Sequence, residues 1–359
     1  MLNLIDVPHN HLYTSQELTF KAQLKQKYDA LSAVEQKKRA RDLAHLLDVT
    51  EAQWVASSLG TLQSIRLEGD GREVFKAIGS LGSVMALTRN QSCVHERHGE
   101  YLNIQAQGPV GLVLGPDIDL RIFFSRWAHV WAVQDQDRLS LQFFDQAGVA
   151  VHKVFCTEET NTSAYLALVQ RFAAAPHWPV SQETPKSIRQ AHAADRVALR
   201  QAWLDLKDTH DFFTMLQKFD VERLGALSDV GSDLAQQISV DRIDTMLRAA
   251  AHAQMSIMCF VGNPGMIQIH SGVVEKIVQQ GPWLNVLDQK FNLHLNLDRI
   301  QNVWVVNKPT TDGWVTSIEI FDEAGEMIVQ FFGARKPGVP EQPAWRELLV
   351  SLCSEKLAA

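Results

Sequence analysis

The sequence contains an internal duplication, and this feature limits the possible folds more than any other. Residues 139–148 (LSLQFFDQAG) return as residues 316–325 (TSIEIFDEAG), an offset of 177. Residues 130–133 (VWAV) return as 303–306 (VWVV) at an offset of 173, and residues 48–49 return as 220–221 at 172. A period of about 175 residues is too long for a solenoid and fits a duplicated domain. We predict two similar tandem halves, at 1–174 and 190–359, joined by a proline-containing linker at 175–189.

Each half combines helical and strand patterns. Apolar residues recur at helical spacing over 33–47 and 191–219, whereas alternating runs typical of strands occupy 111–114, 118–122, 130–133, 139–143 and 149–155. The repeated loops end at Gly148 and Gly325, residues that tolerate the positive φ of hairpin turns. The predicted fold class is therefore α+β, with a large, mainly antiparallel sheet and helices in each half. A ligand cleft is expected between the two halves.

Charge and cysteine usage narrow the class of protein. Lys and Arg number 34 against 41 Asp and Glu, and the resulting net charge of −7 disfavours nucleic acid or an anionic membrane as the principal partner. The four cysteines lie far apart and are expected to be free thiols in a reducing compartment. We find no secretory signal and no apolar run of about 18 residues, so the prediction is a cytoplasmic protein without membrane insertion.

Two sets of motifs carry a resemblance to a known family. The C-terminal set is WxxLxDxHxFF at 203–213, FVGN at 260–263, GVVEK at 272–276, WLN at 283–285 and KPTTDG at 308–313. The N-terminal set is TRN at 88–90, VHE at 94–96, IDLR at 118–121 and QFFD at 142–145. In this order, and over nearly the whole chain, the motifs resemble the HemS/ChuS family of bacterial hemin-degrading and hemin-transport proteins. The resemblance implies haem (Fe-protoporphyrin IX) as ligand or substrate.

The resemblance also assigns the residues on the two faces of the haem iron. It implies that His210 is the axial ligand and that Arg121 faces the iron from the other side. Considered without the family, His210 shares a predicted helix face with the apolar Trp203 and Leu206, which is typical of a buried core histidine. Arg121 alternates with Asp119 on one strand face, which is typical of a local ion pair.

Further residues would surround the ligand. Arg223, Lys308 and Arg335 match family positions that line the polar edge of the haem or its upper surface, and cations at the polar edge suit propionate carboxylates. Their ordinary alternative is a solvated surface charge.

Three residues would form the wall of the site. Gln330 and Phe332 point to the same face of a strand by its period of two, and Phe260 is a wall residue or a plain core phenylalanine. Family members commonly have tyrosine at the position of Phe332. Its absence removes a hydroxyl from any water network there.

His294, which lies 173 residues after Arg121, is expected to be structural.

Three functions remain open at this point. The first is a cytoplasmic haem-binding protein of bacterial haem uptake and iron acquisition, which stores haem or delivers it from the uptake transporter to a downstream degrading enzyme. The second is a haem oxygenase-like enzyme that opens the porphyrin itself, with Arg121 on the distal side. The third is an interaction module without a cofactor. The sequence does not decide whether the protein is an enzyme.

Overall fold

The computed structural model describes residues 4, 13–69, 71–179, 191–336 and 338–359. The chain divides into two compact units. Unit 1 comprises Met1–Thr88, Glu96–Pro185 and Asn263–Gln268, and unit 2 comprises Arg89–His95, Lys186–Gly262 and Ile269–Ala359. Both contain helices and antiparallel sheet, which confirms the predicted α+β class. The boundaries 1–174, 175–189 and 190–359 stay a prediction, and residues 180–189 of that linker lie outside the described residues.

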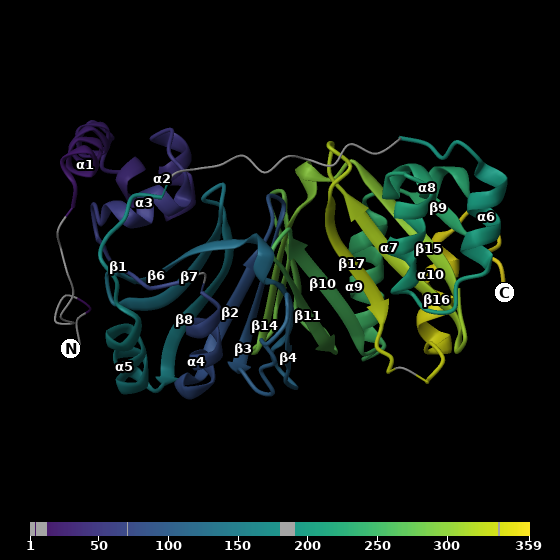
Figure 1. The fold of residues 1–359 in the computed structure, drawn as a ribbon. Helices are drawn as coiled ribbons and strands as arrows, with labels where there is room; N and C mark the ends of the chain where they lie inside the picture. Colours follow the sequence, from purple (N-terminus) through teal and green to yellow (C-terminus); the bar gives the residue numbers. More distant parts are fainter. Residues whose placement is uncertain (1–3, 5–12, 70, 180–190, 337) are drawn as a thin grey trace. The chain divides into compact units, whose positions relative to one another are not determined.

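Unit 1 builds its sheet from strands in the order β1-β6-β7-β8-β2-β3, beside the hairpin β4-β5 (Figure 1). The strands are β1 Leu62–Arg66, β2 Gly82–Arg89, β3 Cys93–Glu100, β4 Val110–Leu114, β5 Asp119–Phe123, β6 Trp127–Asp135, β7 Arg138–Asp145 and β8 Ala150–Thr160. The helices are α1 Ser15–Asp29, α2 Ala40–Leu46, α3 Glu51–Ser57, α4 Arg72–Ala77 and α5 Thr162–Phe172. Short 3₁₀ turns span Glu35–Lys37, Ile78–Leu81 and Phe124–Arg126. The strands predicted from alternation are thereby confirmed.

The strand orders β11-β10-β17-β16-β15-β9 and β14-β13-β12 belong mainly to unit 2, although the unit boundary falls within β11, as it does within β3. These strands are β9 Ala235–Ile238, β10 Ile257–Asn263, β11 Met266–Gly272, β12 Ile277–Gln280, β13 Trp283–Leu287, β14 Phe291–Asn296, β15 Asn302–Thr310, β16 Gly313–Phe321 and β17 Met327–Gly333. The helices are α6 Arg196–Leu204, α7 Asp211–Lys218, α8 Arg223–Asp229, α9 Arg242–His252 and α10 Pro343–Leu352, with a 3₁₀ turn at Leu297–Arg299. Within the described ranges, no helix of either unit is long and apolar enough to cross a membrane.

The register of the strands confirms the duplication. In unit 1 the row β1-β6-β7-β8-β2 places Arg66, Trp131, Gln142, Lys153 and Leu87 opposite one another in succession. In unit 2 the row β9-β15-β16-β17-β10 does the same with Gln237, Trp304, Glu319, Gln330 and Phe260. The two halves therefore share one strand order and one register.

The repeated loops have the predicted hairpin geometry. The Gly148 N–H donates to the Asp145 carbonyl at 3.1 Å, and the Gly325 N–H donates to the Asp322 carbonyl at 3.1 Å. Both glycines have φ of 75°, a left-handed conformation that glycine adopts without a steric penalty. The same turn therefore closes the same hairpin in each half.

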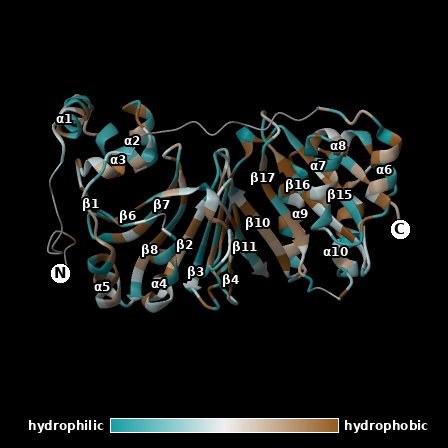
Figure 2. Ribbon diagram, viewed as in Figure 1, coloured by the Kyte–Doolittle hydropathy of each residue, from teal (hydrophilic) through white to brown (hydrophobic). Residues whose placement is uncertain are grey.

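The sheet of unit 2 buries its two faces against different helices. One face packs against α9 and α10 in a core that includes Val305, Ile318 and Phe331. The opposite face packs against α6, α7 and α8 through Trp304 and Val306. Figure 2 shows brown, hydrophobic stretches along these strands, as expected for a sheet with apolar cores.

A short C-terminal tail follows α10 and lies against the β9 side of unit 2. The Gln236 side-chain amide donates to the Glu355 carbonyl at 2.8 Å and accepts from the Glu355 N–H at 3.0 Å. Further along, the Ala358 N–H donates to the Asp233 carbonyl at 2.9 Å, and the Arg346 guanidinium donates to the Ala358 carbonyl at 2.5 Å. These bonds hold the tail to the sheet over several residues.

Candidate functional site

His210 occupies an exposed turn directly before α7. The prediction that His210 shares one helix with Trp203 is wrong, because α6 ends at Leu204 and α7 begins at Asp211. The carboxylate of Asp208 accepts the backbone N–H of His210 at 2.8 Å, and such a side-chain bond competes with helical hydrogen bonding. The His210 side chain is 91% exposed, whereas Trp203 is fully buried. The interpretation of His210 as a buried core histidine is therefore wrong.

The imidazole of His210 is oriented by the same carboxylate. Its Nδ1 lies 2.6 Å from the Asp208 Oδ1. An ionised carboxylate only accepts hydrogen bonds, so Nδ1 carries the proton and the lone pair of a neutral ring remains on Nε2. The His210 backbone N–H, assisted by the imidazole and by the charge of Arg335, holds the pKa of Asp208 below its usual value. The turn therefore presents a coordinating nitrogen to solvent.

Arg335 lies near this turn and is held by a second carboxylate. Its Nη2 donates to Asp312 Oδ2 at 3.0 Å. The backbone of the β15–β16 turn is tied to the chain before His210, since the Thr311 N–H donates to the Lys207 carbonyl at 3.0 Å. The segment after β17, the β15–β16 turn and the turn that carries His210 are therefore neighbours within unit 2.

Arg223 and Lys308 meet at one buried carboxylate, Glu319. Arg223 binds it with two parallel hydrogen bonds, from Nε at 2.7 Å and Nη2 at 2.6 Å, and Lys308 Nζ donates to Oε1 at 2.7 Å. The side chain of Glu319 is fully buried and that of Lys308 is 4% exposed, whereas that of Arg223 is 27% exposed. Lys308 is therefore not a solvated surface charge.

Burial and mutual attraction set the ionisation of this cluster. Burial lowers the pKa of Lys308 to about 8; the Glu319 carboxylate counteracts this effect, and the Arg223 charge adds to it. Burial by itself would raise the pKa of Glu319, but the two cations outweigh it and hold that pKa well below its usual range. The ring of Phe212, two residues after His210, lies 4.3 Å from the Lys308 ammonium and 4.8 Å from the Arg223 guanidinium. The cluster carries a formal surplus of one positive charge.

Phe260, Gln330 and Phe332 form a partly exposed aromatic patch on β10 and β17. Gln330 faces Phe260 across the strands, and the rings of Phe260 and Phe332 meet edge to face with centroids 5.2 Å apart. Gln330 also faces Glu319 on β16, so the patch shares a sheet face with the charged cluster. The predicted common face of Gln330 and Phe332 is confirmed by this register.

Arg121 belongs to unit 1, on β5. Its guanidinium makes an ion pair with Asp119, and Nη1 also donates to the Leu120 carbonyl at 3.2 Å. The local ion pair predicted from strand alternation is thereby confirmed, and the side chain keeps 34% of its surface exposed. Its approach to an iron stays a prediction.

His294 makes a hydrogen bond to a neighbouring strand, as expected for a structural residue. It lies on β14, and its Nδ1 lies 2.7 Å from the side-chain oxygen of Asn285, the residue that faces it on β13. Over the described parts of the chain, no group of three or more His, Cys, Asp or Glu side chains could hold a bare metal ion.

Sequence reasoning missed the three carboxylates that organise these groups: Asp208, Glu319 and Asp312. Asp208 is two residues from His210 in the motif, which could have signalled the contact. Glu319 is separated by 96 residues from Arg223, and no local signal links them.

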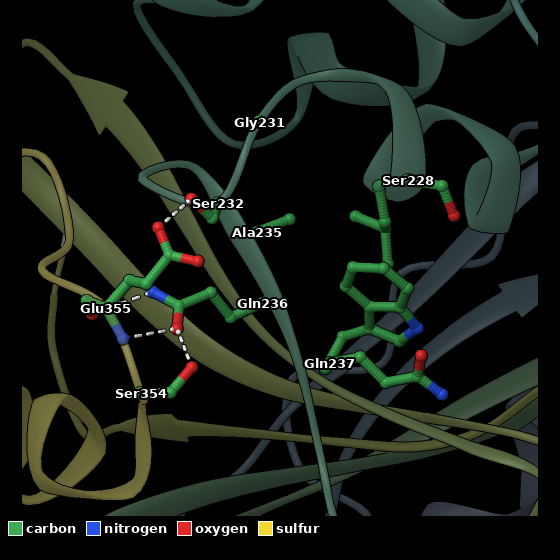
Figure 3. Close-up of a pocket in the computed structure, with 10 residues that line it drawn as sticks. Ser228, Gly231, Ser232, Ala235, Gln236, Gln237, Ser354 and Glu355 are labelled. Atoms are coloured by element: carbon green, nitrogen blue, oxygen red, sulfur yellow. Dashed lines mark hydrogen bonds between the residues drawn. The ribbon is translucent and has the colours of Figure 1, made fainter.

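A cavity of about 260 Å³ lies elsewhere in unit 2, between α8, β9 and the C-terminal tail (Figure 3). Many of the polar groups that line it hydrogen-bond one another: Ser232 donates to Glu355, and Gln236 bonds to Glu355 and Ser354. None of the predicted site residues lines it, and it is smaller than the 300–1,000 Å³ typical of small-molecule sites. These contacts serve to anchor the tail.

Comparisons with known proteins identify relatives over almost the full length of the chain. The hemin transport protein HmuS of Yersinia pestis is 39% identical over 345 residues, which cover 94% of this chain and 99% of HmuS. The crystal structure of holo-PhuS, a heme-binding protein from Pseudomonas aeruginosa, is 44% identical with a TM-score of 0.88, covering 92% of this chain and 99% of that one. The heme degrading enzyme ChuS of Escherichia coli O157:H7 is 35% identical with a TM-score of 0.84, covering 93% and 99%.

The family model of the haemin-degrading HemS.ChuX domain matches this chain twice. The matched residues are 48–172 and 220–352, one segment in each repeat. Together with the full-length relatives, this match covers both copies of the duplicated sheet. The chain therefore belongs to the haemin-degrading HemS/ChuX domain family.

Proposed function

We propose that the protein binds haem through His210 and carries it in the cytoplasm as part of bacterial iron acquisition. The observation that carries this proposal is the exposed imidazole of His210, which keeps Nε2 open because Asp208 occupies Nδ1. A neutral imidazole is the usual axial ligand of haem iron. The donor chemistry of the site therefore fits haem. The four free cysteines agree with a reducing compartment.

The two cations of the charged cluster would have different roles in binding the propionates of haem. Arg223 uses Nε and Nη2 for Glu319, so its Nη1 donors and its 27% exposed surface can serve a ligand carboxylate. Lys308 is too deeply buried to reach outward and instead balances the charge of Glu319. Arg335, already paired with Asp312, would add a second cation beside the His210 turn.

The aromatic patch would supply an apolar surface for the porphyrin. Phe260 and Phe332 are partly exposed, and Gln330, which faces Glu319 on β16, adds a side-chain amide to the patch. Because Phe332 replaces the tyrosine common in the family, this surface packs against a ring without contributing a hydroxyl.

The experiment that tests the proposal is a hemin titration followed by absorption spectroscopy. The wild-type protein should give a stoichiometric, sharpened Soret band that shifts or weakens in His210→Ala. His294→Ala is the matched control and should behave as wild type, because His294 is committed to Asn285. An unchanged spectrum in His210→Ala would reject His210 as the ligand. Absence of binding by the wild type would favour an interaction module without a cofactor.

Carriage and degradation are separated by a second experiment. HmuS is described as a transport protein and ChuS as a degrading enzyme, and this chain resembles both. Bound haem supplies the oxygen chemistry in either case, and the protein supplies ligation, orientation and hydrogen bonds. We propose carriage from the uptake transporter to a downstream degrading enzyme. Rapid ring opening with a physiological electron donor, in the presence of catalase, would reject a purely carrying role.

Arg121 is proposed to face the iron from the side opposite His210. The support is the family resemblance and a permanently charged guanidinium whose exposed surface is available to hold water or oxygen. Arg121→Ala should alter the exchange of small ligands at bound iron while leaving the His210-dependent Soret band in place. Identical exchange kinetics in wild type and variant would argue against this role.

A further inference from the structure

The side chains around His210 restrain its ring through a single carboxylate. One oxygen, Asp208 Oδ1, accepts both the backbone N–H of His210 at 2.8 Å and the ring Nδ1 at 2.6 Å. The ring is 91% exposed, so packing contributes little to its orientation. The backbone and the imidazole of His210 are thus fixed relative to one atom.

The chain segment next to Asp208 is tied to the β15–β16 turn. Arg335 lies close enough for its charge to act on Asp208, and the Arg335 guanidinium is anchored by Asp312. Asp312 also accepts the Gly338 backbone N–H at 2.9 Å, and the adjacent Thr311 is tied to Lys207. The backbone directly before Asp208 is therefore anchored to the β15–β16 turn.

We propose that Asp208 is a positioning residue for His210: it holds the ring with Nδ1–H toward its own carboxylate, so that Nε2 is presented to the haem iron as a more basic ligand. This inference rests on the proposed haem ligation by His210. Ligating histidines generally donate their second ring N–H to a carboxylate or carbonyl, and loss of that partner typically weakens metal binding about 10–100-fold.

The competing interpretation is purely local. An aspartate two residues before a backbone N–H commonly forms a turn, and the ring contact could be incidental to that turn. The two interpretations separate in Asp208→Asn. The asparagine carbonyl can still accept the His210 backbone N–H, so the turn is retained, but the negative charge on the ring partner is lost.

The first test uses the protein without haem. Nitrogen-15 correlation spectra of the His210 ring should show the proton on Nδ1 in wild type and a shift of the population toward protonated Nε2 in Asp208→Asn. An unchanged tautomer ratio would overturn the proposal. Circular dichroism and thermal unfolding of the variant should match wild type, which excludes loss of the turn as the cause.

The second test uses the hemin complex. Asp208→Asn should weaken hemin binding about tenfold, raise the iron midpoint potential and lower the frequency of the ferrous iron–histidine stretch, because the less basic ring donates less charge. Asp208→Glu, which keeps the carboxylate, should restore part of each change. Unchanged potential and stretch in Asp208→Asn would overturn the proposal even if Asp208→Ala lowers the melting temperature.

The two proposals fail in distinguishable ways. If His210→Ala leaves the hemin spectrum unchanged, ligation by His210 is wrong and the role of Asp208 falls with it. If His210→Ala removes the ligation signature but Asp208→Asn changes neither the tautomer nor the potential, only the inference about Asp208 is wrong.

Discussion

The same helix position carries opposite charges in the two units. In unit 1 the first residue of α3, Glu51, pairs with Lys153 on β8. In unit 2 the first residue of α8, Arg223, pairs with Glu319 on β16. Both units thus have an ion pair between a helix and the sheet. The charge of the helix residue differs between the units, and so does the strand that carries its partner.

Helix electrostatics favour the arrangement in unit 1. A carboxylate at a helix N-terminus interacts favourably with the helix dipole, whereas a cation there does not. Arg223 therefore depends on Glu319 for compensation. Lys308 adds a second cation, where the equivalent position in unit 1, four residues after the shared tryptophan, holds Asp135. Only the C-terminal copy of this cluster combines a surplus positive charge with an exposed guanidinium, which suits an anionic ligand.

The histidine follows the same division. Asp48 lies between α2 and α3, Asp220 lies between α7 and α8, and both adopt positive φ, which gives a local offset of 172. By this offset the counterpart of His210 is Lys38. The comparison shows that unit 2 combines an exposed histidine with a cluster of surplus positive charge, whereas unit 1 has a neutral ion pair at the equivalent helix.

The largest test of the comparison is removal of the shared carboxylate. Glu319→Gln leaves two cations without their buried partner and should lower the free energy of unfolding by about 3–5 kcal/mol. The matched change in unit 1, Glu51→Gln, should cost about 1–3 kcal/mol because it strands one lysine. Urea unfolding followed by tryptophan fluorescence measures both. Equal losses would contradict the distinction between the two clusters.

The pH dependence of the free energy of unfolding should reveal the lowered pKa of Lys308. Its pKa is about 8 in the folded protein against 10.5 ordinarily, so between these values the unfolded chain binds more protons. Stability attributable to Lys308 should therefore rise from pH 8 to pH 10.5, by at most about 3 kcal/mol, and be lost as the pH falls through 8. The measurement is the difference in urea unfolding between wild type and Lys308→Met over this window. A difference that does not change with pH would show that Lys308 keeps its ordinary titration.

Hemin affinity should depend on the fork of Arg223 and not on its unit 1 counterpart. Arg223→Lys keeps the charge but loses the planar fork, and should weaken hemin binding about tenfold. Glu51→Gln should leave the affinity unchanged. Titration with a haem dimethyl ester, which lacks propionate charges, should abolish the difference between wild type and Arg223→Lys. Persistence of the difference would exclude propionate binding as its cause.

The smallest effect concerns the aromatic residues at one equivalent position. Phe332 pairs with Phe260, whereas its counterpart Phe155 stacks under the Arg138 guanidinium at 4.8 Å. Phe332→Leu should lower the free energy of unfolding by about 1 kcal/mol, and Phe155→Leu by about 0.5 kcal/mol. Only Phe332→Leu should also weaken hemin binding. An equal effect of both variants on hemin would remove the distinction between the two patches.

Periodicity predicted the strands well because their side chains follow a local rule. Alternation around Leu139 and Val149 needs no knowledge of the partner strands, and the hairpin at Gly148 is likewise local. The prediction that one helix contains both Trp203 and His210 failed because the helical spacing of apolar residues continues through the turn between α6 and α7. In the turn between α6 and α7, the Asp208 carboxylate accepts the His210 backbone N–H in place of a helical hydrogen bond. The spacing of apolar residues does not reveal this bond.

The residues of the candidate site could be named from the family motifs, but their partners could not. Lys308 and Arg223 were expected to line the haem or, as the alternative, to be solvated surface charges; their shared contact with Glu319 was not predicted. That meeting depends on the register between β15 and β16 and on where α8 begins. These are tertiary facts, and a carboxylate between two isoleucines gives no sequence signal for them.

The C-terminal tail has a consequence for the solution behaviour of the protein. β9 is the last of the described strands in the order β11-β10-β17-β16-β15-β9. An edge strand offers unpaired backbone groups to other molecules. The side-chain amide of Gln236 on β9 binds the Glu355 backbone through both its nitrogen and its oxygen, and Leu357 is buried in unit 2. We therefore expect the tail, which packs beside β9, to hinder edge-to-edge association of the sheet.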